Sequence, residues 1–165
     1  MTIRNLIFFI ILIAAALGSA YAHADDLSKD IFVSDAWVQA MPPSQTTTAA
    51  YMVISNNSQK EAILESASSD IAGATEIHQM SDMNGMMNMA MVSNIHIPAL
   101  GKVTLNPEGF HIMLINLKKP VDKGDLVPIT LHFQDGSSVI VNAQAKLTGN
   151  VETGNVSSGM PGMKM

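Results

Sequence analysis

The side chains best suited to chemistry in this chain are histidines and methionines gathered between Glu76 and Met113. They are His78, Met80, Met83, Met86, Met87, Met89, Met91, His111 and Met113. The 165-residue chain contains 13 methionines and no cysteine. Imidazole nitrogen combined with thioether sulfur, without a thiolate, suits a soft monovalent metal such as Cu(I). Zinc rarely takes a thioether ligand, and calcium and magnesium prefer oxygen.

The spacing of these residues fits β-strands, in which residues i and i+2 point to the same face. His111 and Met113 would share a face of one strand, and His78 and Met80 would share a face of another. The alternating methionines of the segment 87–91 would do the same on a third strand. Because neighbouring strands lie about 4.8 Å apart, side chains from three strands can converge on one metal ion.

Short apolar runs separated by turn residues indicate an all-β, antiparallel sandwich or barrel. Asn84-Gly85 is a strong hairpin turn between β-compatible segments. The segment 95–105 contains Pro98 and Gly101, which predict a bend followed by a short strand. The other strands are expected at 31–38, 49–55, 62–66, 74–80, 86–92, 110–117, 127–133 and 138–146.

The two ends of the chain differ in composition from this middle part. Arg4 followed by the apolar run Leu6 to Leu17 and small residues is typical of a secretory signal peptide, 1–24, with cleavage after Ala22 or Ala24. Export to the periplasm follows, and the absence of cysteine excludes both a lipoprotein anchor and disulfides. We expect the copper-binding domain at 25–147 and a disordered, methionine-containing tail at 148–165.

Net charge argues against nucleic-acid binding, and the length of the apolar run argues against a membrane span. The formal net charge is −5, and the eight lysines are scattered without forming a basic stripe. Nucleic-acid binding is therefore disfavoured. The apolar run of the signal peptide is too short for a comfortable membrane span, so we expect no stable membrane insertion. A monomer is expected.

The order and spacing of four residues resembles a known family. Ten residues separate His78 from Met89, twenty-one separate Met89 from His111, and one separates His111 from Met113. This arrangement is similar to the motif of the periplasmic PCuAC-type copper chaperones. The resemblance extends over about 115 residues. It includes the segments Asp35-Ala36-Trp37, Ala50-Tyr51, Glu76-Ile77-His78, Pro107-Glu108-Gly109-Phe110-His111, Lys118-Lys119-Pro120 and Gly124-Asp125.

This resemblance implies a cupredoxin-like β-sandwich of Greek-key type that binds one Cu(I) per domain. The implied ligands are His78, Met89, His111 and Met113, with Met80 as an auxiliary residue. It also implies delivery of copper to the copper-binding subunit of cytochrome c oxidase, alongside a Sco-type copper protein.

Three other functions compete with this one: copper sequestration, electron transfer and oxygenase activity. A periplasmic protein that sequesters copper without delivering it would use the same ligands and stays open. A blue-copper electron carrier requires a cysteine thiolate, which this chain lacks. An oxygenase with an N-terminal histidine would need cleavage directly before His23, and would not need the methionines, so we expect no enzyme. His96 and His132 have no methionine two residues away, which indicates structural or solvated histidines.

Overall fold

The computed structural model describes residues 27–83 and 85–147, with only the backbone of Met83. The predicted signal peptide and methionine-containing tail lie outside these residues. A short 3-10 helix, Leu27–Lys29, precedes the first strand. The strands are β1 Ile31–Gln39, β2 Thr47–Asn56, β3 Ala62–Ser68, β4 Ala74–Met83, β5 Met86–Met91, β6 Ile95–Ile97, β7 Gly101–Leu105, β8 Phe110–Ile115, β9 Leu126–Phe133 and β10 Ser138–Lys146.

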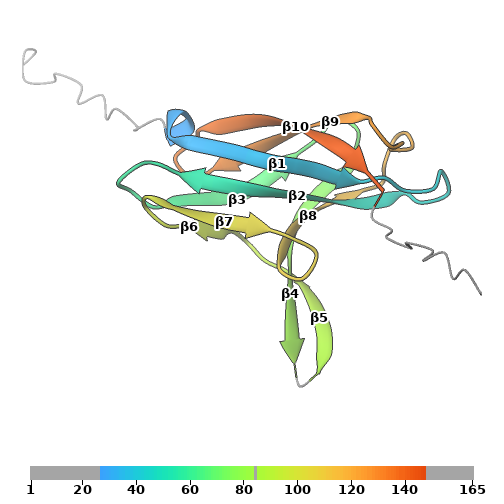
Figure 1. Ribbon diagram of the computed structural model, residues 1–165, viewed down its shortest axis with the longest axis horizontal. Coiled ribbons are helices and arrows are strands. Elements are labelled where there is room, and N and C mark those ends of the chain that lie inside the picture. The colour runs from blue at the N-terminus through green and yellow to red at the C-terminus, as the bar shows by residue number, and fades with distance from the viewer. Residues whose placement is uncertain (1–26, 84, 148–165) are drawn as a thin grey trace, which may run out of the picture.

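The strands form one continuous hydrogen-bonded sheet in the order β5-β4-β8-β7-β2-β1-β10-β9-β3-β6, and β8 also pairs with β2. The sheet folds over on itself, so that strands distant in this order, such as β3 and β4, pack against each other. Figure 1 shows the resulting layers, with the β4–β5 hairpin extending away from them. The predicted all-β class is therefore confirmed.

The core between the layers is built from aliphatic side chains of nearly every strand. Fully buried members include Met52, Ile54, Leu64, Ile95, Ile97, Ile112, Leu114, Ile129 and Leu131. Each such side chain contributes about 1.5–3 kcal/mol relative to an exposed one. This core must stabilise the fold without disulfides, because the chain has no cysteine.

The strands depart from the predicted ranges and directions in three places. β4 continues to Met83 rather than ending near residue 80, because it pairs with β5 as far as Met83 and Met86. β8 stops at Ile115 rather than at 117, since Asn116 adopts a positive φ of 54°. The pairs β1–β10 and β7–β8 are parallel, so the sheet is not wholly antiparallel as the sequence predicted.

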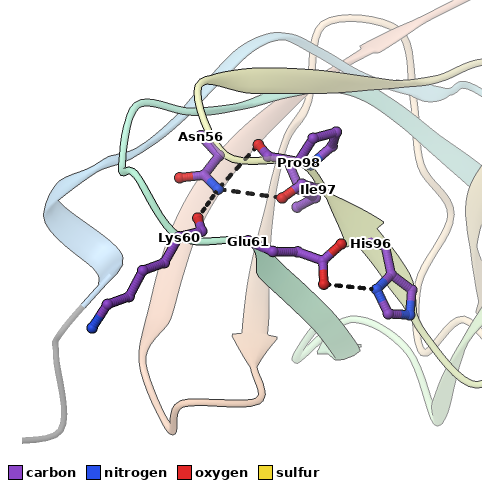
Figure 2. A network of polar contacts seen from close by, with 6 residues as sticks. All are labelled: Asn56, Lys60, Glu61, His96, Ile97 and Pro98. Carbon is purple, nitrogen blue, oxygen red and sulfur yellow. Dashed lines mark hydrogen bonds and ion pairs between the residues drawn. The ribbon is translucent and has the colours of Figure 1, made fainter.

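A buried carboxamide joins the end of β2 to β6, the strand at the other end of the sheet order from β5. Asn56, at the end of β2, is fully buried and donates from Nδ2 to the carbonyl oxygens of Lys60 at 2.7 Å, Ile97 at 3.2 Å and Pro98 at 3.2 Å (Figure 2). It thereby joins the β2–β3 turn to β6. Nearby, Glu61 and His96 form an ion pair at 3.2 Å in which both side chains are more than half exposed.

These two contacts predict effects of different size on stability. Asn56→Ala removes three hydrogen bonds of a fully buried carboxamide, one of them to the buried carbonyl of Ile97, and should lower the free energy of unfolding by about 2–3 kcal/mol. Glu61→Gln removes only an exposed ion pair and should change it by less than about 1 kcal/mol. Urea unfolding of both variants measures the difference; equal losses would contradict the role given to Asn56.

Candidate metal site

One face of the three adjacent strands β5, β4 and β8 carries His78, His111 and most of the methionines singled out by the sequence, whereas Met86 lies on the opposite face. Residues directly opposite each other in neighbouring strands point to the same face of a sheet. In register, His78 lies opposite Met91 on one side and His111 on the other, and Met80 lies opposite Met89. We call this surface the His–Met face; it carries His78, Met80, Met87, Met89, Met91, His111 and Met113, and Glu76 of β4 lies on it as well.

The two histidines lie at the centre of the His–Met face. Their ring centroids are 5.8 Å apart. Cross-strand pairing of β4 with β8 fixes this distance, because His78 and His111 are direct partners in the ladder. Met113 lies two residues along β8 from His111, opposite Glu76 of β4. β4 of the hairpin pairs directly with β8, the strand that carries His111 and Met113.

His111 is held from two sides. It is only 4% exposed, and its Nδ1 lies 3.1 Å from the carbonyl oxygen of Gly109. A carbonyl can only accept, so Nδ1 carries the proton and Nε2 keeps its lone pair free for a metal. The ring also packs near Tyr51 at a centroid separation of 6.3 Å, and Tyr51 in turn stacks on Trp37 at 4.4 Å.

His78 is held differently. Its Nε2 lies 2.8 Å from Oε2 of Glu76, two residues earlier on the same face of β4. Its Nδ1 is buried and finds no hydrogen-bond partner among the described residues. A buried polar atom without a partner is uncommon and calls for a physical explanation, such as a missing ion.

The methionines of β5 form the outer, open part of the His–Met face. Met89 is 50% exposed and Met91 is 68% exposed. All six residues of β5 are exposed, although methionine is usually a core residue. This contrast places the partly buried His78 beside thioethers that a second molecule can reach.

The donor set fits a soft monovalent ion. Within residues 27–83 and 85–147, no group of three or more His, Cys, Asp or Glu side chains could hold a metal. The register neighbours of the two histidines on this face include thioethers, with Met91 opposite His78 and Met113 two residues along β8 from His111. Imidazole and thioether together suit Cu(I).

Comparison with known proteins agrees with this geometry. The sequence pattern of the family described as "Putative lipoprotein LpqE-like" matches residues 31–145. The chain belongs to this LpqE-like, PCuAC-type family. Two relatives are Lxx21020 of Leifsonia xyli subsp. xyli, 36% identical over 69% of this chain and 68% of its own length, and RP573 of Rickettsia prowazekii, 30% identical over 73% of each.

Solved structures place the same fold in other members of the family. The Cu(I) form of DR1885 from Deinococcus radiodurans is 35% identical, with a TM-score of 0.58 over 81% of this chain and 87% of that one. The copper-bound PCuAC domain from PmoF2 is 22% identical, with a TM-score of 0.60 over 72% of this chain and 93% of that one, and this likeness concerns the fold. The predicted cupredoxin-like sandwich is confirmed.

The lipoprotein description of the LpqE-like family fits an exported protein. In the part of the chain that the structure describes, no helix has the length and apolar character needed to span a bilayer.

Among the residues named from the sequence, the structure pairs His78 directly with His111. Met113 lies one register step to one side of this pair on β8, and Met80 and Met89 lie one register step to the other side on β4 and β5. The histidines expected to be structural or solvated lie elsewhere: His96 pairs with Glu61, and His132 hydrogen-bonds to Ser68. From the sequence, Met91 is one of the alternating methionines and Glu76 stands beside His78 in the motif, but neither has a ligand role. The structure places Met91 directly opposite His78 and Glu76 within hydrogen-bond distance of His78, a contact for which the i, i+2 spacing was the available signal.

The burial of His111 predicts a pH-dependent stability of the copper-free protein. Desolvation lowers the pKa of His111, the hydrogen bond to Gly109 opposes this, and nearby His78 lowers it further. The unfolded chain, with a histidine pKa of about 6.5, then takes up a proton first as pH falls. Folding stability should consequently drop below about pH 6.5.

His111→Asn keeps an N–H for Gly109 but removes the titrating group. Urea unfolding of the copper-free protein at pH 7.5 and 5.5 should show a smaller loss of stability in the variant than in the wild type. An equal or larger loss would contradict the assigned pKa direction.

Proposed function

We propose that this protein is a non-enzymatic Cu(I) chaperone that binds one copper ion through His78, Met89, His111 and Met113, with Met80 as an auxiliary residue. The observation that carries the proposal is the His–Met face, where neighbouring strands bring two imidazoles 5.8 Å apart among thioethers. The copper-bound forms of DR1885 and of the PmoF2 PCuAC domain support it.

The position of the site favours a carrier over a permanent cofactor. β5 is exposed along its whole length and forms the edge of the sheet, so a partner can reach its thioethers directly. A thioether releases Cu(I) without a proton transfer. The buried His111 gives affinity from one side, while the exposed methionines let copper leave from the other.

The register makes the choice of the hairpin ligand testable. Met91 is directly opposite His78, whereas Met89 is a diagonal neighbour. Diagonal side chains in a sheet are about 7–8 Å apart, which a long methionine spans by leaning along the strand. The proposed ligand Met89 must therefore reach across Met80 and His78 toward His111.

We expect Met89→Ala to weaken Cu(I) binding about tenfold or more, equal to about 1.4 kcal/mol or more, and Met91→Ala to weaken it less. Met86→Ala, on the opposite face of the same strand, is the matched control and should bind Cu(I) as the wild type does. Competition with a Cu(I) chelator measures all three. A larger loss in Met91→Ala would transfer the ligand role to Met91.

We further propose that the protein works in the periplasm as a monomer. Its cargo would go to the copper-binding subunit of cytochrome c oxidase, with a Sco-type copper protein as companion. The exported character of the family and the lack of oxidisable thiols in the sequence support this compartment. The accessible edge strand supports transfer by direct contact.

The recipient is tested by transfer and by deletion. The Cu(I)-loaded protein should pass copper to the reduced copper-binding domain of the oxidase subunit or to a Sco-type protein, and Met113→Ala should fold but fail to deliver. Cells lacking the protein should lose oxidase activity when copper is scarce and regain it with added copper.

A different result would support sequestration. If deletion leaves the oxidase active and only raises sensitivity to copper, the protein retains copper without delivering it.

A further inference from the structure

The contact between Glu76 and His78 is the polar feature of the His–Met face that the ligand set does not use. Oε2 of Glu76 lies 2.8 Å from Nε2 of His78. The His78 side chain is 14% exposed and that of Glu76 is 39% exposed, so the contact lies at the border between protein and solvent. Both residues point to the same face, since they are two apart on β4.

This contact fixes where the proton of the neutral imidazole lies. An ionised carboxylate can only accept hydrogen bonds, so Nε2 must donate. Nδ1 is then the nitrogen with a free lone pair. It is also the buried atom that has no hydrogen-bond partner within the described residues. Metal-binding histidines commonly have this arrangement: one ring nitrogen donates to a carboxylate, and the other keeps its lone pair for the metal.

We propose that Glu76 is a positioning residue that orients His78 and makes Nδ1 the nitrogen that binds copper. This inference rests on the proposed function and deepens it. The two histidines would then use different atoms: His111 is held at Nδ1 by the carbonyl of Gly109 and binds through Nε2, whereas His78 is held at Nε2 and binds through Nδ1.

Charge gives Glu76 a second effect. Two neutral imidazoles and two thioethers leave the charge of Cu(I) uncompensated. A carboxylate on the opposite side of a ligand imidazole increases the electron density at the coordinating nitrogen and compensates part of that charge. Glu76 supplies this carboxylate without itself touching the metal.

Nitrogen-15 NMR of the histidine rings tests the assignment directly, because Cu(I) is diamagnetic. In the copper-free protein at pH 7.5, His78 should be protonated at Nε2 with a downfield Nε2 proton. On addition of one equivalent of Cu(I), the large shift should occur at Nδ1 of His78 and at Nε2 of His111. Coordination of His78 through Nε2 would overturn the inference.

Substitutions separate positioning from general electrostatics. Loss of a residue that supports a metal ligand typically weakens metal binding 10–100-fold, so Glu76→Ala should weaken Cu(I) binding about 10–100-fold. Glu76→Gln keeps an acceptor for Nε2 and should recover part of this loss and the downfield proton. Glu65 lines the same surface pocket as Glu76 and Met91, so Glu65→Ala and Glu65→Gln are matched charge controls that should bind nearly as the wild type does.

The outcomes distinguish this inference from the proposed function. Equal losses in the Glu76 and Glu65 variants would reject positioning by Glu76. A protein that binds one Cu(I) with a shift at Nε2 of His78 rejects only the inference. A protein that binds no Cu(I) at all contradicts both.

Discussion

The pairing of β4 with two strands at once is the constraint on which the site depends. β4 is bonded to β8 on its inner side and to β5 on its outer side. This double ladder places His78 between Met91 and His111 in one row across the sheet. A shift of either ladder by one residue would turn its side chains to the other face and separate the histidines from the methionines.

Solvent exposure differs between the two ends of this row: the β8 end lies in the molecule and the β5 end is exposed. β8 lies inside the molecule, where Ile112 and Leu114 belong to the core and anchor the strand that carries His111. β5 has no partner on its outer side in the sheet order, and its side chains are exposed. Under the proposed function, a partly buried histidine pair next to an exposed edge of thioethers would reconcile retention of copper with its release, because thioether ligands can be exchanged one at a time.

The hydrogen bonds around the histidines have a common pattern. Each ring is held at one nitrogen by an oxygen of the protein, Gly109 for His111 and Glu76 for His78. Gly109 also accepts the backbone N–H of Met80, which ties the turn before β8 to the hairpin. The turn therefore positions the ring of His111 and the strand of His78 together, before any metal is present.

The sequence predicted the all-β class, the hairpin around Asn84-Gly85 and the alternation of histidines and methionines, because strand periodicity and turn chemistry are local properties. The same turn also fixes which methionine lies opposite His78. A two-residue turn at Asn84-Gly85 pairs residue 83 with residue 86, and counting along the two strands then pairs His78 with Met91 rather than with Met89. The parallel β1–β10 pair was missed, since its partners are far apart in sequence and no local signal marks their direction.

The central claim is that histidine nitrogen and methionine sulfur from three neighbouring strands hold one Cu(I). X-ray absorption spectroscopy of the protein loaded with one equivalent of Cu(I) tests it most directly. We predict an edge of monovalent copper and a first shell with both nitrogen and sulfur scatterers, about two of each. A first shell without sulfur would contradict the account, because the His–Met face would then not be the copper site.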